Sequence, residues 1–260
     1  MTAAASARTP EASLRARPAQ LVATGINVSF GALQVLSNLS VEVSEGELVG
    51  IIGPNGAGKT TLFSVLVGAL RPRSGSVAFD GHDVTGLPVA ARCRQGLVRT
   101  HQIPRPFNEM TVFENVLVAA SVSRSSGRQE RQDRQDRAIA SLAYTEMLWA
   151  ANRRAGELGL LDRKRLELSR ALATQPKMLL LDEIGGGLSD VEALELLDMI
   201  RALSKQGITI VWVEHIVSLL LKGASRLLCL HGGRIIADGR PEAVIEDPVV
   251  RSAYLGGGIP

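Results

Sequence analysis

Residues 53–60 read Gly53-Pro54-Asn55-Gly56-Ala57-Gly58-Lys59-Thr60 and match the pattern G-x-x-x-x-G-K-[ST] at every position. The apolar run 48–52 comes directly before them, and a helix-like stretch follows. Glycines let successive backbone N–H groups converge on phosphate oxygens, and the helix dipole points at the same anion. We therefore predict a nucleotide site that includes Thr61, in which Lys59 reaches the terminal phosphates and the Thr60 hydroxyl binds Mg²⁺. A purely structural glycine turn is the alternative, which the flanking strand and helix argue against.

Two carboxylates end a second apolar run, at residues 178–181. In a parallel α/β sheet, ligands bind at the carboxyl ends of the strands. Asp182 is therefore predicted to hold Mg²⁺, and Glu183 to orient or deprotonate an attacking water. An Asp-Glu pair that merely caps a helix is the alternative, and the phosphate loop upstream ranks it lower.

Strand-like and helix-like stretches alternate on both sides of a helical middle. Strands are expected at 48–52, 76–80, 98–101, 178–181, 208–213 and 227–230, and helices at 59–70, 163–173 and 191–203. This alternation predicts a mostly parallel sheet covered by helices. Residues 111–173 are mostly helix-like, with Thr111 as an N-cap and a second helix over 138–151, and are expected to form an insertion in the α/β core.

Composition restricts the class of protein. Of 260 residues, 45% are hydrophobic and 21% charged, which is typical of a globular chain. Aromatic residues make up only 3% and the net charge is +3, which argues against nucleic-acid binding. Two cysteines, Cys93 and Cys229, favour a reducing compartment. We see no secretory signal and no apolar run of the about 18 residues that a membrane span needs, so we expect a cytoplasmic protein.

Two polar segments are expected to lie outside the core. Residues 1–20 carry Arg8, Arg15 and Arg17 with little to bury, which predicts a disordered tail; a transit peptide is the weaker interpretation because of Glu11. Residues 124–137 read RSSGRQERQDRQDR. They predict a solvated helix with internal ion pairs, and a basic contact with lipid or a partner is less favoured.

Over residues 21–255 the chain resembles the ATP-binding-cassette (ABC) ATPases. The similarity is greatest to the ATPase subunits of branched-chain (hydrophobic) amino acid importers, through four stretches: RTHQ at 99–102, EMTVFENVLVA at 109–119, RALATQP at 170–176 and AYLG at 253–256. The resemblance implies an α/β fold: a P-loop NTPase (RecA-like) core with an antiparallel β subdomain and an inserted α-helical subdomain. It divides the chain into a tail 1–20, a single ATPase domain 21–246 and a tail 247–260, with core 21–102 and 174–246 around a helical subdomain 103–173.

The same resemblance assigns roles to three further residues. Gln102 matches the family's Q-loop glutamine, which contacts Mg²⁺ and water. His215, after the strand 208–213, matches the switch histidine, which can hydrogen-bond a γ-phosphate. Phe30 matches the aromatic residue that stacks on adenine. Taken alone, such a histidine is more often structural and such a phenylalanine more often core.

The chain departs from the family at its signature, usually Leu-Ser-Gly-Gly-Gln before a helix. The aligned residues are Leu158-Gly159-Leu160-Leu161-Asp162. In the family this segment caps the γ-phosphate of ATP bound to the opposite subunit, so Gly159, Leu160 and Asp162 are candidate contacts. Either the leucines pack and catalysis is slowed, or the site is half-competent. In addition, Ile184 replaces a common proline, and residues 185–190 read GGGLSD.

The resemblance also implies partners. Two ABC ATPase chains, identical or different, would sandwich two Mg-ATP head to tail at the cytoplasmic face of the membrane. Membrane permease subunits would dock near Gln102, at apolar residues that are otherwise core: Ile103, Phe107, Met110, Val112 and Phe113. A periplasmic or extracellular solute-binding protein would act indirectly, and no nucleic acid is expected. Another cargo (an amide, a urea-like solute or an exported lipid), a soluble ABC ATPase or scaffold, and a non-hydrolysing binder remain alternatives.

Overall fold

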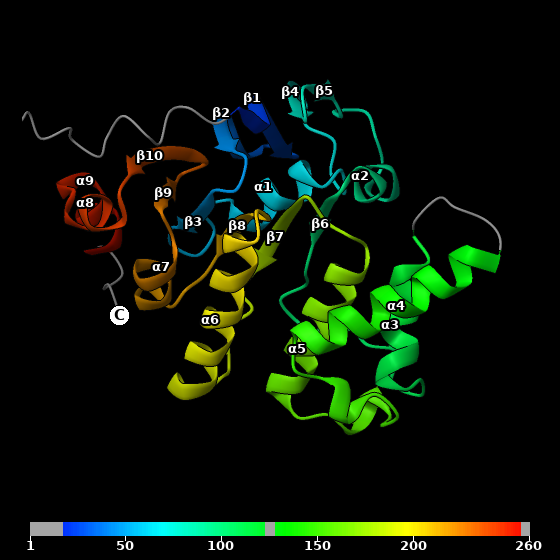
Figure 1. The fold of residues 1–260 in the computed structure, drawn as a ribbon. Helices are drawn as coiled ribbons and strands as arrows, with labels where there is room; N and C mark the ends of the chain where they lie inside the picture. The colour runs from blue at the N-terminus through cyan, green and yellow to red at the C-terminus, as the bar shows by residue number, and fades with distance from the viewer. Residues whose placement is uncertain (1–17, 123–127, 256–260) are drawn as a thin grey trace, which may run out of the picture.

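A six-stranded sheet forms the centre of the molecule in the computed structural model, which describes residues 18–122 and 128–255 (Figure 1). Its strands are, in spatial order, β10 (Arg234–Gly239), β9 (Arg226–His231), β3 (Leu48–Ile52), β8 (Thr209–Val213), β7 (Met178–Asp182) and β6 (Leu97–Arg99). All neighbours pair in parallel except β10 and β9. The carboxyl ends of β3, β7 and β8 therefore meet at one edge, as the sequence predicts.

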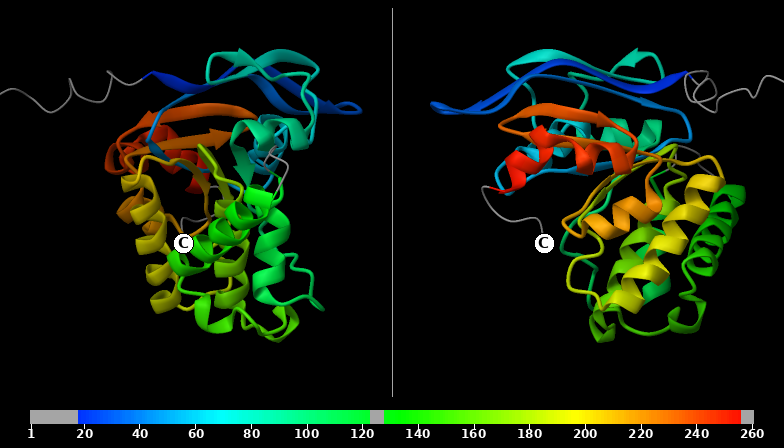
Figure 2. Two further views of the ribbon diagram at one scale, coloured as in Figure 1. Left: turned by 45° about the vertical axis from the view of Figure 1, so that its right-hand side comes forward. Right: turned by 90° about the vertical axis from the view of Figure 1, so that its left-hand side faces the viewer.

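A four-stranded antiparallel sheet lies across the central sheet (Figures 1 and 2). Its order is β2 (Leu33–Ser44), β1 (Ala19–Phe30), β4 (Ser74–Phe79) and β5 (His82–Asp83). Helix α1 (Lys59–Leu66) packs between the two sheets, where Phe63 and Leu66 are buried with Ile26 and Val77 in one core. The expected α/β fold, with a separate antiparallel sheet, is confirmed.

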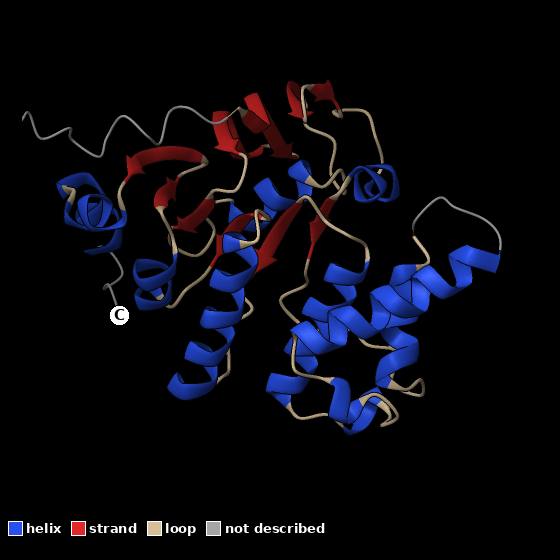
Figure 3. Cartoon of the chain, viewed as in Figure 1, coloured by secondary structure: helices blue, strands red, loops and turns tan. Residues whose placement is uncertain are grey.

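Helices cover the opposite face of the central sheet (Figure 3). Helices α6 (Asp190–Lys205) and α7 (Val217–Gly223) share a second core with it, and α8 (Pro241–Glu246) and α9 (Pro248–Leu255) pack at its β10 end. Helices α3 (Val112–Ala120), α4 (Arg128–Tyr144) and α5 (Leu160–Ala173) enclose a third core of their own. Within the described ranges, no helix is both long and apolar enough to cross a membrane.

Local signals begin two helices at the expected places. The Thr111 hydroxyl accepts the backbone N–H of Glu114, whose carboxylate in turn accepts the N–H of Thr111, so a capping box begins α3. Ser189 and Glu192 form the same reciprocal box at the start of α6. The prediction of Thr111 as an N-cap is therefore confirmed.

Several predicted helix boundaries are wrong. Helix α1 ends at Leu66 rather than residue 70, because Gly68 takes a left-handed φ of 81° just after the C-cap. The guanidinium of Arg92, in α2 (Val89–Gln95), donates to the carbonyl oxygens of Val65 and Leu66 that the helix leaves free at this end. The helix expected over 138–151 is replaced by α4, which ends at Tyr144, followed by short 3-10 turns. Helix α5 begins three residues earlier than expected.

The segments expected to be tails are partly structured. Strand β1 begins at Ala19, before the expected start at residue 21, and residues 248–255 form α9. Residues 1–17, 123–127 and 256–260 lie outside the described residues, and with them most of the predicted N-terminal tail. From Arg128 onward, the polar joint is the first part of α4, where Arg134 pairs with Glu130 at i,i+4.

Candidate active site

The glycine-rich loop between β3 and α1 is packed too tightly for side chains at two positions. A Cβ on Gly53 would lie 2.2 Å from the carbonyl oxygen of Leu230, in neighbouring β9. Gly58, the N-cap of α1, has φ 106°, and a Cβ there would lie 2.8 Å from Leu36 Cδ2. Only glycine avoids both the clash and the strained backbone, so the loop stays close to the end of β3.

Lys59 curls back over this loop. Its Nζ donates to the carbonyl oxygens of Gly53, at 2.6 Å, and Pro54, at 3.1 Å, and the residue is only 6% exposed. Burial lowers the pKa of Lys59, while the nearby carboxylates of Glu183 and Asp182 act in the opposite direction. The ammonium group therefore contacts the phosphate loop and is near enough to interact electrostatically with the acidic pair, which the sequence predicts to share one site with that loop.

Asp182 is the last residue of β7 and is 3% exposed. Its Oδ2 accepts from Arg99 Nη2 at 2.5 Å, and Arg99 Nη1 donates to Ser64 Oγ of α1 at 3.2 Å. Arg99 ends β6, where it pairs with Leu180 of β7. Arg99 has no role among the predicted site residues, although an arginine that ends a strand beside the acidic pair is a usable signal.

The two carboxylate oxygens of Glu183 each contact one of the residues that are expected to act with it. Gln102 Nε2 makes a short hydrogen bond to Glu183 Oε2, and His215 Nε2 lies 2.6 Å from Oε1. The backbone of Glu183 has a left-handed φ of 48°, and its N–H donates to the carbonyl oxygen of Val213, the last residue of β8, at 2.9 Å. The carboxylate is 11% exposed and the imidazole 48%, so the trio lies at the protein surface.

A second buried acid, which is not among the predicted site residues, is hydrogen-bonded to the loops that carry Glu183 and His215. Glu214 is 2% exposed, and its carboxylate accepts the backbone N–H groups of Gly185 and His215. Burial raises the pKa of Glu214, while these hydrogen bonds and Lys164 act in the opposite direction. An acidic residue directly between the apolar strand β8 and His215 is the signal that points to it.

Two further sets of predicted residues lie on other elements, the β1–β2 hairpin and the start of α5. Phe30 is at the tip of the β1–β2 hairpin, 55% exposed and paired with Leu33. Gly159 is the N-cap of α5, without a side-chain cap, and Leu160 and Asp162 are in the first turn rather than before the helix. Leu160 is 45% exposed, and its Cδ2 would lie 3.1 Å from a Cβ on Gly187, so the signature borders the loop after Glu183.

The donor set fits a magnesium ion that arrives with a nucleotide. The Thr60 hydroxyl, the Asp182 carboxylate and the Gln102 amide offer the oxygen ligands that Mg²⁺ prefers. Among residues 18–122 and 128–255, no group of three His, Cys, Asp or Glu side chains could hold a metal. Few protein ligands suit Mg²⁺, which keeps water and phosphate oxygens in its coordination sphere.

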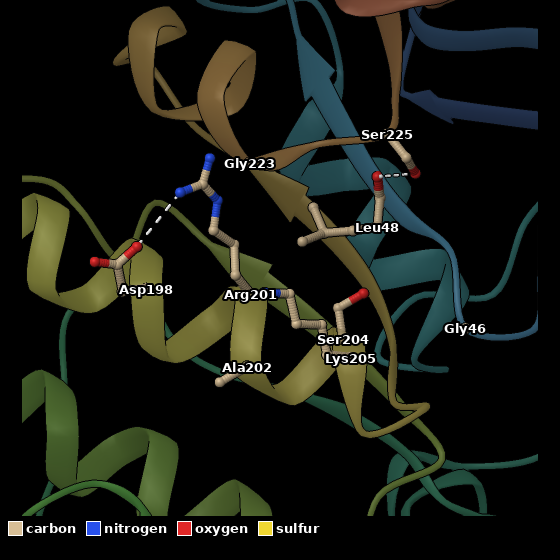
Figure 4. Close-up of a pocket in the computed structure, with 9 residues that line it drawn as sticks. All are labelled: Gly46, Leu48, Asp198, Arg201, Ala202, Ser204, Lys205, Gly223 and Ser225. Carbon is tan, nitrogen blue, oxygen red and sulfur yellow. Dashed lines mark hydrogen bonds and ion pairs between the residues drawn. The ribbon is translucent and has the colours of Figure 1, made fainter.

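A surface cavity of about 650 Å³ lies at the other end of β3 (Figure 4). Leu48, the first residue of β3, lines it, and Arg201 pairs there with Asp198 at 3.4 Å. Ser225 Oγ donates to the carbonyl oxygen of Leu48 at 3.0 Å. None of the predicted site residues lines this cavity. The candidate site lies instead at the edge formed by the carboxyl ends of β3, β7 and β8, where the predicted residues meet.

Comparisons relate the chain to transporter ATP-binding proteins. The family model described as ABC transporter matches residues 36–185, and the one described as branched-chain amino acid ATP-binding cassette transporter matches 234–259. The high-affinity branched-chain amino acid transport ATP-binding protein LivG of Salmonella typhimurium is 38% identical over 248 residues, 91% of this chain and 97% of that protein. The lipopolysaccharide export system ATP-binding protein LptB of Acidithiobacillus ferridurans is 36% identical over 238 residues, 91% of this chain and 96% of that protein. A crystal structure of an ABC transporter's ATP-binding cassette in its ADP conformation has a TM-score of 0.84 at 32% identity, covering 92% of this chain and 99% of that one.

Proposed function

Because the chain belongs to the ATP-binding proteins of the ABC transporter family, we propose that it hydrolyses ATP to drive import of branched-chain amino acids through separate permease subunits. The observation that carries the ATPase part is the meeting of Gln102, Glu183 and His215 beside the phosphate loop. The cargo rests on the match of residues 234–259 to the branched-chain amino acid transporter model and on the identity to LivG.

Nucleotide binding follows from the loop and its lysine. The backbone N–H groups of Asn55, Gly56 and Gly58 and those at the start of α1 donate to the phosphates, and Lys59 exchanges its two carbonyl partners for phosphate oxygens. Phe30, an exposed aromatic residue, stacks on the adenine. Thr60, Thr61, Asp182 and Gln102 complete the contacts, with Thr60, Asp182 and Gln102 holding Mg²⁺. When bound, the ion neutralises charge on the phosphate oxygens.

Hydrolysis uses Glu183 as the general base. Its carboxylate takes a proton from a water whose oxygen attacks the γ-phosphorus atom, while the bond from that phosphorus to the bridging oxygen of ADP breaks and releases ADP and phosphate. Gln102 holds the other carboxylate oxygen, and we expect His215 to leave Glu183 and donate Nε2–H to the γ-phosphate. Both contacts keep the carboxylate oriented before the nucleotide arrives.

The site is completed by other chains. A second ABC ATPase, the same chain or another, supplies its signature segment to the nucleotide held here, and this chain's Gly159, Leu160 and Asp162 face the partner's nucleotide. Permease subunits dock beside Gln102, where Ile103 is 71% and Phe107 47% exposed; Val112 is buried in the helical core instead. The chain then works at the cytoplasmic membrane face, with a solute-binding protein on the other side.

Lipopolysaccharide export is the second candidate, because LptB is 36% identical to the chain. Reconstitution with the co-purifying permease in liposomes separates the two. We expect ATP turnover to rise when a binding protein loaded with leucine, isoleucine or valine is added. Stimulation by lipopolysaccharide and not by these amino acids would favour export instead. Co-purification with ribosomes or DNA in place of a permease would contradict transport altogether.

A further inference from the structure

Glu214 is a buried carboxylate to which the proposed reaction assigns no role. Its Oε1 accepts the N–H of Gly185 at 2.6 Å and the indole Nε1–H of Trp212 at 3.2 Å. Its Oε2 accepts the N–H of His215 at 3.2 Å. A buried charge is costly unless it is hydrogen-bonded or paired, so three converging donors indicate a built position rather than an accidental one.

The donors come from both sides of the Glu183–His215 contact. Gly185 lies two residues after Glu183, on the loop that follows β7, and His215 lies on the loop that follows β8. One carboxylate therefore ties together the two loops whose side chains meet at 2.6 Å. Loss of the Glu214 carboxylate would remove a backbone hydrogen bond from both loops at once.

Glycine at position 185 is what lets the carboxylate reach this loop. A Cβ there would lie 3.0 Å from Glu214 Oε1 and 3.0 Å from Leu219 Cδ1, closer than ordinary van der Waals contact. The next glycine is different: a Cβ on Gly186 would meet only the carbonyl oxygen of Glu183, at 3.4 Å. The Glu214 contact thus accounts for the first of the three consecutive glycines.

A buried cation balances the acid. Lys164 of α5 is 5% exposed, attracts Glu214 electrostatically, and donates to the carbonyl oxygen of Glu183 at 3.4 Å. Burial lowers the pKa of Lys164, while both glutamates act in the opposite direction. The carboxylate is therefore linked to the helix that begins with the signature residues as well as to the two loops.

We propose that Glu214 is a positioning residue that fixes Glu183 and His215 relative to each other through the backbone N–H groups of Gly185 and His215. It touches neither the nucleotide nor the attacking water. The inference rests on the proposed ATPase function and adds a residue on which the geometry of that site depends.

The test substitutes Glu214→Gln. The amide keeps the shape of the side chain but has a single acceptor oxygen, so one of the two loops loses its bond whichever way the amide turns. We expect kcat for ATP to fall about tenfold or more, with KM for ATP within about twofold of wild type. Glu47→Gln is the matched control: Glu47 is also largely buried, accepts the N–H of Ser44 and pairs with Arg226, but lies at the far end of β3. Its kcat should be unchanged.

A glycine pair tests the same contact without altering the acid. Gly185→Ala should reproduce the loss of kcat, whereas Gly186→Ala should retain most of the activity. Because Gly185→Ala and Glu214→Gln break one contact, the double variant should be no slower than the slower single variant. A general loss of stability would instead lower the melting temperature and give additive losses.

The outcomes separate this inference from the function on which it rests. Wild-type kcat in both Glu214→Gln and Gly185→Ala, or additive losses in the double variant, would overturn the positioning role. If Glu183→Gln abolishes turnover in the same assay, the ATPase proposal survives that result. If wild-type protein with its permease shows no turnover, the ATPase proposal fails first.

Discussion

Arg99 and Asp182 form a 2.5 Å ion pair across two neighbouring strands, β6 and β7. The side chains are 14% and 5% exposed, and the guanidinium also lies 5.7 Å from the ring centroid of Phe63 in α1. The carboxylate proposed to hold Mg²⁺ is thus paired with a cation of its own chain. This pair keeps the carboxylate oriented and spares it the cost of being buried alone.

Removing the cation should expose that cost. Arg99→Met leaves the Asp182 charge buried without its partner, so we expect the free energy of unfolding to fall by about 3 kcal/mol. Urea unfolding in EDTA measures it. The double variant Arg99→Met/Asp182→Asn removes both charges and should recover most of the loss. Equal midpoints for Arg99→Met and wild type would mean that the pair contributes nothing.

Lys59 should contribute to the affinity for the nucleotide and contribute little to the stability of the fold. Lys59→Met removes a buried ammonium whose desolvation offsets its bonds to Gly53 and Pro54, so the melting temperature should change little. The affinity for ATP should fall about ten- to a hundredfold, because a charge-assisted bond to phosphate is lost. Titration calorimetry measures the affinity. An unchanged dissociation constant would place the phosphates elsewhere.

The unusual signature should limit pairing between copies of this chain. The first turn of α5 presents Leu160, 45% exposed, and the negative Asp162 where an anion would approach the helix N-terminus. Changing residues 159–162 from Gly-Leu-Leu-Asp to Ser-Gly-Gly-Gln should raise ATP-dependent dimerisation about tenfold or more. Light scattering, which measures the molar mass in solution, would detect the shift from monomer to dimer in a Glu183→Gln background. No gain in dimer would show that the leucines do not limit the contact.

Acid should weaken the start of α3. Hydrogen bonds from Thr111 hold the pKa of Glu114 below its ordinary value of 4.5. A carboxyl group whose pKa is lowered in the folded state contributes its full stabilisation when the pH is above the ordinary pKa. This contribution disappears as the pH falls through the folded-state pKa. Glu114→Gln should therefore melt below wild type at pH 7, and the gap should close toward pH 3. A gap of constant size across this range would contradict the capping role.

Much of the site follows from sequence because its signals are local. The run 48–52 coincides with β3, and the residues after β3, β7 and β8 meet at one edge because parallel strands end there together. Gln102, Glu183 and His215 each follow a strand, so their convergence needs only the correct strand order.

What sequence reasoning missed depends on long-range pairing. Arg99 meets Asp182, and Glu214 meets Gly185, only once the strands are in register. The last carbonyl oxygens of α1 accept hydrogen bonds from Arg92, which belongs to another helix. No periodicity in the sequence predicts such contacts. A charged residue in or next to a predicted buried strand, close to a predicted site residue, is nevertheless a signal that such a contact exists.

Glu183→Gln gives the most direct test of the central claim that this carboxylate drives ATP hydrolysis. The variant should bind ATP with the wild-type dissociation constant, because Lys59 and the loop are untouched, while release of phosphate by the permease-bound protein falls about a hundredfold or more. Phosphate release at the wild-type rate, with ATP still bound, would contradict the account.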